Sequence, residues 1–218
     1  MSLKPRPILS NFLGVLREPR FYTYALAGAV SFAGLLAYVS GSPLVFMEIY
    51  QVNEKQYGWI FAFLSVGLIG ASQVNSLLLR RYRSEQIIVR ALVCQVFIAG
   101  LFVAGTALDM LGLFPSIAFI FFYLCSLGFT FPNASALALA TFTRNAGSAS
   151  AMMGAIQMGI GALATVVLGL FQVQSALPMA TVMAASATLA LLILLLGRRS
   201  IVPGEVHLEA GAAAGMIH

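Results

Sequence analysis

Six long apolar runs constrain the fold of this chain more than any other feature of its sequence. They cover residues 21–46, 57–79, 87–108, 113–139, 149–171 and 177–196. The hydrocarbon core of a bilayer is about 30 Å thick, and a helix needs about 20 predominantly apolar residues to cross it. A transmembrane barrel would instead show short segments of alternating polarity. The sequence therefore predicts an all-α membrane protein, folded as a bundle of six transmembrane helices.

Composition supports the membrane assignment and argues against a water-soluble domain. Of the 218 residues, 60% are hydrophobic and 9% are charged, whereas soluble domains carry about 25% charged residues. The net charge of +5 comes from short basic clusters between the apolar runs, which is typical of membrane topology rather than of nucleic-acid binding. Cys94 and Cys125 each lie inside an apolar run, so we interpret them as packing residues and predict no disulfide framework.

Positive charge lies almost entirely on one side of the predicted bundle. Eleven of the twelve Lys and Arg residues fall in the two terminal segments or close to the second and fourth loops, and only Lys55 falls on the other side. Among them, Arg90 lies near the start of the third run, where its side chain can extend to the interface. Because cytoplasmic loops carry the excess of Lys and Arg, both termini are expected in the cytoplasm.

The chain is predicted to have three parts. Residues 1–20 form a cytoplasmic N-terminal segment, residues 21–197 form the six-helix domain, and residues 198–218 form a cytoplasmic tail. The tail is expected to be disordered, since Ala and Gly dominate it after Gly204. The N-terminal segment lacks a short apolar region followed by a cleavage-type site, so it is not predicted to be a signal peptide.

Catalytic chemistry is not predicted. Both histidines, His207 and His218, lie in the tail, so neither an imidazole base nor a metal cluster is expected within the membrane, and no cofactor is implied. The seven acidic residues lie in loops or at helix ends. A proton-coupled transporter normally keeps a carboxylate at membrane depth. Proton-driven transport would therefore need a titrating group from another polypeptide.

Proline and glycine residues inside the runs could shape helices or bring them together. Pro43 lies near the outer end of the first run and Pro132 in the inner half of the fourth. Each removes a backbone hydrogen bond, which either adjusts packing or opens a cavity. In the fifth run, Gly154, Gly159 and Gly161 favour close approach of a neighbouring helix.

A few polar or adaptable side chains at membrane depth are candidates for substrate contact. Met153 and Gln157 lie four residues apart and share a helix face, although Gln157 could instead form an interhelical hydrogen bond. A buried tyrosine hydroxyl needs a partner, so Tyr38 and Tyr123 either bond a neighbouring helix or line a wet cavity. The predicted substrate-binding residues are Tyr38, Tyr123, Asn133, Met153 and Gln157.

Five stretches of the chain occur in a recognisable order and spacing. They are Gly-Ser-Pro-Leu-Val-Phe-Met-Glu-Ile-Tyr (41–50), Phe-Ala-Phe (61–63), Asn-Ser-Leu-Leu-Leu-Arg-Arg (75–81), Pro-Asn-Ala-Ser-Ala-Leu-Ala (132–138) and the Gly- and Ala-rich segment 146–162. Together they resemble the second half of the Bcr/CflA drug-resistance transporters of the major facilitator superfamily. The resemblance covers nearly all of residues 10–200. It implies that the six helices match helices seven to twelve of a twelve-helix transporter.

The superfamily's loop signature, Gly-x-x-x-Asp-Arg-x-Gly-Arg, can be laid on residues 75–83. Arg80 and Arg83 match it, whereas Asn75, Leu79 and Tyr82 replace its Gly, Asp and Gly. Such decay is typical of the second-half copy of this motif. By the resemblance, Asn75, Arg80 and Arg83 join the prolines and glycines above as structural or gating residues.

The resemblance implies a multidrug-efflux antiporter of the bacterial inner membrane that moves small amphipathic or cationic compounds. It also implies that the first, second, fourth and fifth helices face a central cavity. The family's coupling carboxylates lie mainly in the first half, and alternating access needs two halves. We therefore expect a second six-helix half, from a homodimer or from a separate polypeptide. The alternative is a non-transporting membrane module or a truncated fragment that associates with another membrane protein.

Overall fold

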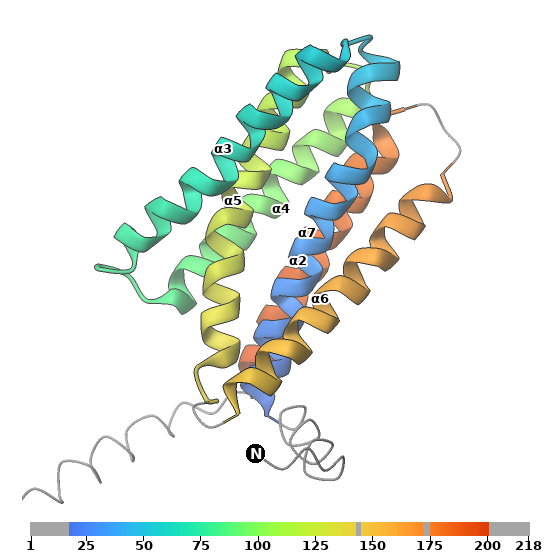
Figure 1. The fold of residues 1–218 in the computed structure, drawn as a ribbon. Coiled ribbons are helices and arrows are strands. Elements are labelled where there is room, and N and C mark those ends of the chain that lie inside the picture. Colours follow the sequence, from blue (N-terminus) through green and yellow to red (C-terminus); the bar gives the residue numbers. More distant parts are fainter. Residues whose placement is uncertain (1–17, 143–144, 172–174, 201–218) are drawn as a thin grey trace, which may run out of the picture.

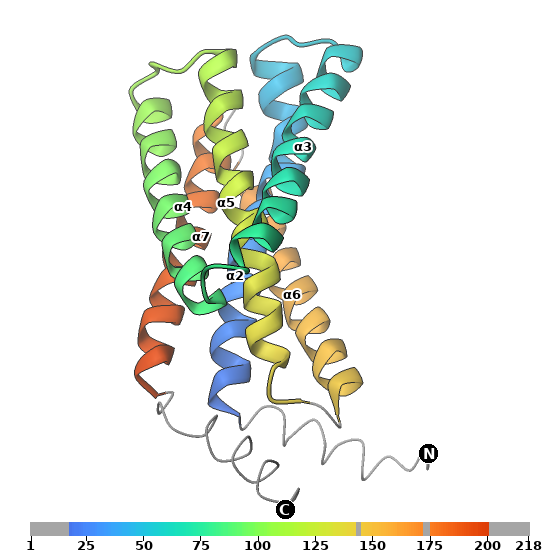
Figure 2. The ribbon, with the colours of Figure 1, turned by 90° about the vertical axis from the view of Figure 1, so that its left-hand side faces the viewer.

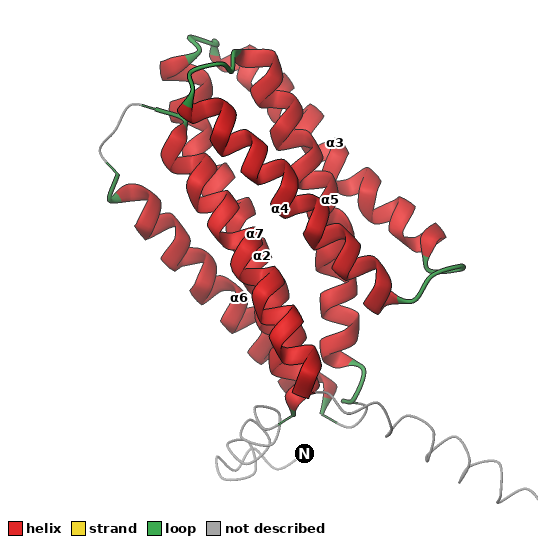
Figure 3. Ribbon diagram, turned by 180° about the vertical axis from the view of Figure 1, so that it is seen from behind, coloured by secondary structure: helices red, strands yellow, loops and turns green. Residues whose placement is uncertain are grey.

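The computed structural model describes residues 18–142, 145–171 and 175–200, and every regular element within these ranges is helical (Figure 3). Helix α2, Pro19–Pro43, continues directly into a short π-helix, η1, Leu44–Ile49. The other helices are α3 (Glu54–Leu78), α4 (Ser84–Ala107), α5 (Leu113–Leu139), α6 (Ala146–Gly169) and α7 (Leu177–Ser200). Six segments are long and apolar enough to cross a membrane. The predicted six-helix membrane fold is therefore confirmed.

Local sequence signals explain where several helices begin. Pro19 lies at the start of α2, where its missing N–H costs nothing. The start of α3 is a capping box, in which the Gln56 backbone N–H donates to the Asn53 side chain at 2.9 Å. The Asn53 backbone N–H donates in return to the Gln56 side chain at 3.2 Å. These bonds satisfy backbone donors that the first turn of a helix leaves free.

The helices form two layers. In the front layer of Figure 1, the order is α3, α5, α2 and α6, and each helix packs against the next. Helices α4 and α7 form the back layer, where they pack against each other and against α5 and α2; Figure 3 shows this layer from behind. The two outer helices of the front layer, α3 and α6, are the least buried of the six. The front layer thus contains the four helices that the resemblance places at a cavity.

Close helix contacts depend on small residues at the centre of the front layer. A Cβ atom added at Gly128 of α5 would lie 2.5 Å from the backbone oxygen of Leu68 in α3. A Cβ added at Gly28 of α2 would lie 2.8 Å from the Cβ of Ala134 in α5. The absence of side chains at these glycines therefore lets α5 approach both neighbours closely, as is common in membrane bundles.

The two ends of the bundle differ. The start of α2 and the end of α7 lie together at one end, called here the terminal end, while η1 lies at the far end (Figure 2). The connection between α3 and α4 also points toward the terminal end, but it lies at a shallower level than the ends of α2, α5, α6 and α7. The described helices run from Pro19 to Ser200. Residues 198–200 of the predicted tail belong to α7, and the rest of the tail and most of the predicted N-terminal segment lie outside the described residues.

Both predicted helix interruptions take a milder form than a break. Pro43 is the last residue of α2, and the chain continues from it as the π-helix η1. Pro132 lies inside α5, which remains one helix from Leu113 to Leu139. The chain accommodates each missing N–H without leaving helical structure, as neighbouring helices permit in membrane proteins.

Candidate functional site

A small pocket lies between α2, α5 and α6 in the half of the bundle nearer the terminal end. Its cavity volume is about 10 Å³. The predicted pair Met153 and Gln157 both line it, and Gln157 is only 8% exposed. Facing them are Tyr24 of α2 and Phe131 and Ser135 of α5, among smaller residues. The pocket thus combines an amide, hydroxyls, aromatic rings and a thioether.

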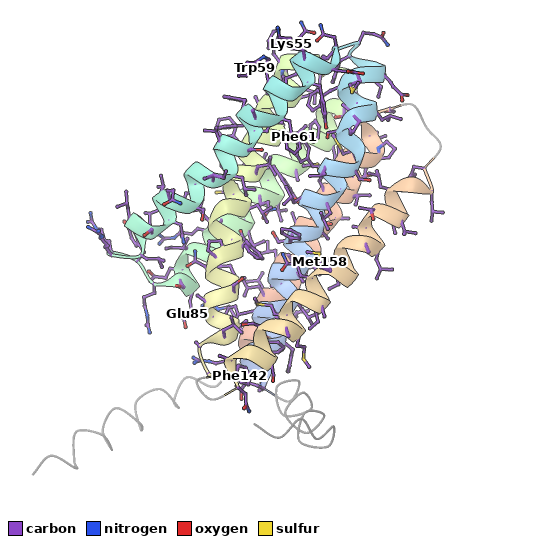
Figure 4. The ribbon with its side chains drawn as sticks, viewed as in Figure 1. Lys55, Trp59, Phe61, Glu85, Phe142 and Met158 are labelled. Carbon is purple, nitrogen blue, oxygen red and sulfur yellow. The ribbon has the colours of Figure 1, made fainter. Side chains whose placement is uncertain are left out.

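Tyr38 lies elsewhere, in the half of the bundle farther from the terminal end. Its ring stacks on Phe61 of α3 with a centroid distance of 6.1 Å and an interplanar angle of 16°. The side chain is 2% exposed, and its hydroxyl has no hydrogen-bond partner among the described residues. Phe61 itself lies between α3 and α2 (Figure 4) and is 37% exposed. The Tyr38 hydroxyl is thus one of four buried side-chain N or O atoms without a partner in the described part of the chain.

Asn133 faces α3 rather than the pocket. Its amide nitrogen donates to the Asn75 side-chain oxygen at 2.7 Å and to the Phe129 carbonyl at 2.7 Å. Both asparagines are buried. The oxygen of Asn133 has no partner in the described part of the chain. The bond between the two asparagines links α3 to α5 in the half of the bundle nearer the terminal end.

Tyr123 lies in the interior between the two layers. It is 1% exposed, and its hydroxyl donates to the Met183 carbonyl of α7 at 3.1 Å. Of the two alternatives open for this tyrosine, the structure contains the interhelical hydrogen bond. Close by in the same interior, the Ser31 hydroxyl donates to the side chain of Gln95 at 3.0 Å and so ties α2 to α4. The five predicted binding residues therefore do not converge on one point, and only Met153 and Gln157 share a pocket.

Two known proteins match most of the chain. The bicyclomycin resistance protein homolog of Haemophilus influenzae is 30% identical over 192 residues, which cover 88% of this chain and 48% of that protein. The uncharacterized MFS-type transporter YdgK of Bacillus subtilis is 26% identical over 178 residues, which cover 80% of this chain and 43% of that protein. No protein-family model matches the chain. The chain spans about half the length of both relatives.

The chain is similar to one half of a Bcr/CflA-type transporter of the major facilitator superfamily. In this chain, the residues laid on the superfamily's loop signature lie at the end of α3 and in the turn to α4. Asn75, at the first position, is the buried partner of Asn133. Arg80 and Arg83 are exposed, and the side chain of Arg83 lies 3.9 Å from Glu85.

The three predicted glycines of α6 have different surroundings. Gly161 is buried, and a Cβ there would meet the side chain of Leu36 in α2. A Cβ at Gly154 or Gly159 would meet no described atom within 4 Å. The bundle itself therefore requires the small size of Gly161 only, and the other two glycines leave the surface of α6 open.

Some residues of the site were not predicted from the sequence. Tyr24 and Ser135 line the pocket, and Gln95 is a fully buried amide inside an apolar run. A polar side chain within a membrane span is itself a signal, and this signal could have identified Gln95. Tyr24 gave no such signal, because a tyrosine near the start of a span is equally typical of the interfacial aromatic belt.

Charged and metal-binding side chains are sparse among the described residues. The described acidic residues, all at helix ends or in connections, are Glu18, Glu48, Glu54, Glu85 and Asp109. Across residues 18–142, 145–171 and 175–200, no group of three His, Cys, Asp or Glu side chains could hold a metal ion. The described site therefore offers hydrogen bonding and aromatic contact rather than ion coordination.

Proposed function

We propose that this chain is one half of a multidrug-efflux transporter and moves small amphipathic or cationic compounds by alternating access with a second six-helix half. The second half is either another copy of the chain or a separate polypeptide. The proposed setting is the bacterial inner membrane, with the terminal end in the cytoplasm because eleven of the twelve Lys and Arg residues belong to that side.

The observation that carries this proposal is the incomplete pocket on the front layer. Ligand pockets usually enclose about 300–1,000 Å³, whereas the pocket beside Gln157 has a cavity volume of about 10 Å³, room for about one water molecule. Its lining comes from α2, α5 and α6, three neighbours in the front layer. A second half facing this layer would supply the opposite wall and enlarge the pocket to the size of a drug-like molecule.

The two outer helices of the front layer support a docking role. On α6, Ala151, Ala155 and Gly159 are exposed and recur every four residues, a spacing that lets another helix approach closely within a membrane. On α3, the exposed side chains include Gln73 and Ser76. Polar groups facing lipid are costly, so contact with a second half or with a water-filled cavity would stabilise them.

The pocket chemistry supports the proposed substrate class. Met153 offers a flexible apolar surface of the kind that promiscuous binding sites use. The Gln157 amide and the Ser135 hydroxyl can hydrogen-bond a ligand, and the rings of Tyr24 and Phe131 can hold an apolar or cationic group. We propose that Tyr38 and Asn133 contact the substrate through their unpartnered oxygens. Tyr123 would position α5 and α7 behind this wall.

The second candidate function is a membrane module without transport activity. The observation that favours it is the absence of an acidic side chain well inside the described spans, because a carboxylate at membrane depth is the usual coupling group of a proton-driven carrier. Such a module would bind another membrane protein through the same exposed α6 surface, but it would not move solute.

Solute flux in proteoliposomes that contain this chain alone tests the proposal. Bicyclomycin, to which the name of one relative refers, and a lipophilic cation serve as test solutes. We expect flux that falls about tenfold or more in Gln157→Ala and Met153→Ala and that stays unchanged in Leu192→Ala, which alters an exposed residue of the back layer. Absence of flux from chains shown to be paired would contradict the homodimer and favour the module.

A further inference from the structure

Two arginine side chains lie against one aromatic ring at the turn between α3 and α4. The guanidinium carbon of Arg81 lies 6.0 Å from the centroid of the Tyr82 ring, and that of Arg90 lies 5.7 Å from it. Both distances are typical of cation–π contacts. Arg81, Tyr82 and Arg90 are called the turn cluster below. The cluster brings a residue of the turn and a residue of α4 together around one ring.

Among the described residues, no carboxylate balances the charge of the turn cluster. The ion pair at this turn joins Arg83 to Glu85 across 3.9 Å, and neither Arg81 nor Arg90 has a carboxylate partner among the described residues. Helix α4 also begins here, and its N-cap residue, Arg83, makes no side-chain cap bond. The N-terminal end of a helix carries a partial positive charge. An anion would therefore relieve the repulsion between these like charges.

An exposed apolar stripe continues along α4 from the turn cluster. Val93, Phe97 and Leu101 follow Arg90 at intervals that keep them on its side of the helix. They are 50%, 66% and 44% exposed. Helix α4 belongs to the back layer, so this stripe is separate from the pocket beside Gln157. A single ligand could contact the cluster with an anionic group and the stripe with a hydrocarbon chain.

The position of the α3–α4 turn along the bundle suits a ligand that has an anionic group and a hydrocarbon chain. The α3–α4 connection is recessed from the terminal ends of the other helices (Figure 2), and Glu85 marks its position in Figure 4. A recessed basic turn lies closer to the membrane than the arginines at the end of α7. Anionic headgroups attract Lys and Arg near the surface by about 1 kcal/mol per residue, and Arg binds phosphate oxygens through several N–H donors.

We propose that the turn cluster binds the phosphate of one anionic phospholipid, with an acyl chain lying along Val93, Phe97 and Leu101. Arg81 and Arg90 donate hydrogen bonds to the phosphate oxygens from two sides. Tyr82 holds the two guanidinium groups apart and beside the headgroup. The site lies on the back layer, so its lipid stays bound without entering the pocket on the front layer.

Native mass spectrometry of the purified full chain in detergent tests this site. The chain is titrated with dioleoyl phosphatidylglycerol, with dioleoyl phosphatidylcholine and, separately, with inorganic phosphate. We expect one tightly bound phosphatidylglycerol and weaker binding of phosphatidylcholine. In R81Q/R90Q the affinity for phosphatidylglycerol falls about 25-fold, which is about fivefold per arginine. The charge-matched control R198Q/R199Q, altered at the exposed end of α7, keeps the wild-type affinity.

Three results overturn the proposal. Equal affinity of the wild type for the two lipids removes the role of the negative charge. Equal losses in R81Q/R90Q and in the control assign the effect to net charge rather than to the turn cluster. Inorganic phosphate that displaces the lipid at equal concentration assigns the site to a free anion. The first and third results come from the wild-type chain, so they stand even if a variant folds poorly.

Discussion

At the scale of single residues, hydrogen-bond partners rather than burial distinguish the polar groups that hold the bundle together from those proposed to contact a ligand. Tyr123 and Tyr38 have the same side chain and similar burial, yet one hydroxyl bonds Met183 and the other has no partner in the described chain. The sequence predicted both as polar groups at membrane depth. It could not separate them, because the difference depends on which carbonyl of a distant helix comes within reach.

Gly128 provides the sharpest test of packing at a single residue. In Gly128→Ala, the new Cβ would meet the backbone oxygen of Leu68, which cannot move as a side chain could. We expect a loss of about 1–3 kcal/mol in the free energy of unfolding, the usual cost of overpacking. Gly100→Ala is the matched control, since a Cβ there meets no described atom within 4 Å. Unfolding in mixed detergent micelles measures both, and equal stability of the two variants would refute the predicted contact.

The bond between Asn75 and Asn133 is expected to contribute modestly to stability. A double-mutant cycle of Asn75→Ala and Asn133→Ala should give a coupling energy of about 0.6–1.7 kcal/mol, the range found for interhelical hydrogen bonds in membranes. Each single variant leaves a buried amide without its partner, so the double variant should lose less than the sum of the two. Strict additivity in the unfolding titrations would show that the 2.7 Å contact contributes no stability.

At the scale of elements, the sequence predicted the number and approximate limits of the helices well. The length of the apolar runs explains this agreement, since each span needs about 20 apolar residues. The predicted run 113–139, for example, coincides with α5. It could not predict which side of each helix is buried, because residues that face lipid are as apolar as residues in the core. The pairing of Met153 with Gln157 was predictable from their spacing, whereas the contribution of Tyr24 to the same pocket needed the arrangement of α2 and α6.

The half of α3 that contains Phe61 is called here its outer half, and the half that contains Asn75 its inner half. The outer half is expected to depend on its aromatic contact with α2. Phe61 stacks on Tyr38, while the inner half of α3 is held by Asn75 and by the close approach to Gly128. In Phe61→Ala we expect faster hydrogen exchange in the outer half of α3 and unchanged exchange in its inner half. Phe97→Ala, at an exposed position of α4, is the control. Uniform change along α3 would contradict two separate anchors.

At the scale of the whole molecule, the exposed surface of α6 is expected to decide whether two halves pair. Gly159→Leu places a large side chain where helices would need to approach closely, but no described atom lies within 4 Å to oppose it in the bundle itself. We expect normal folding and self-association in liposomes about tenfold weaker, equivalent to about 1.4 kcal/mol. Gly100→Leu, at a similarly open glycine on α4, should associate like the wild type. Normal pairing of Gly159→Leu, measured by energy transfer between labelled chains, would exclude this surface.

Alternating access by two halves is the central proposal, and it follows from an incomplete pocket on a layer whose outer helices are the least buried. Flux from proteoliposomes loaded with graded numbers of chains tests it most directly. Vesicles that hold a single copy of this chain should show no transport, whereas vesicles that hold a pair of halves should transport. If flux instead rises in direct proportion to chain number from the single-copy limit, one six-helix bundle transports alone and the proposal is wrong.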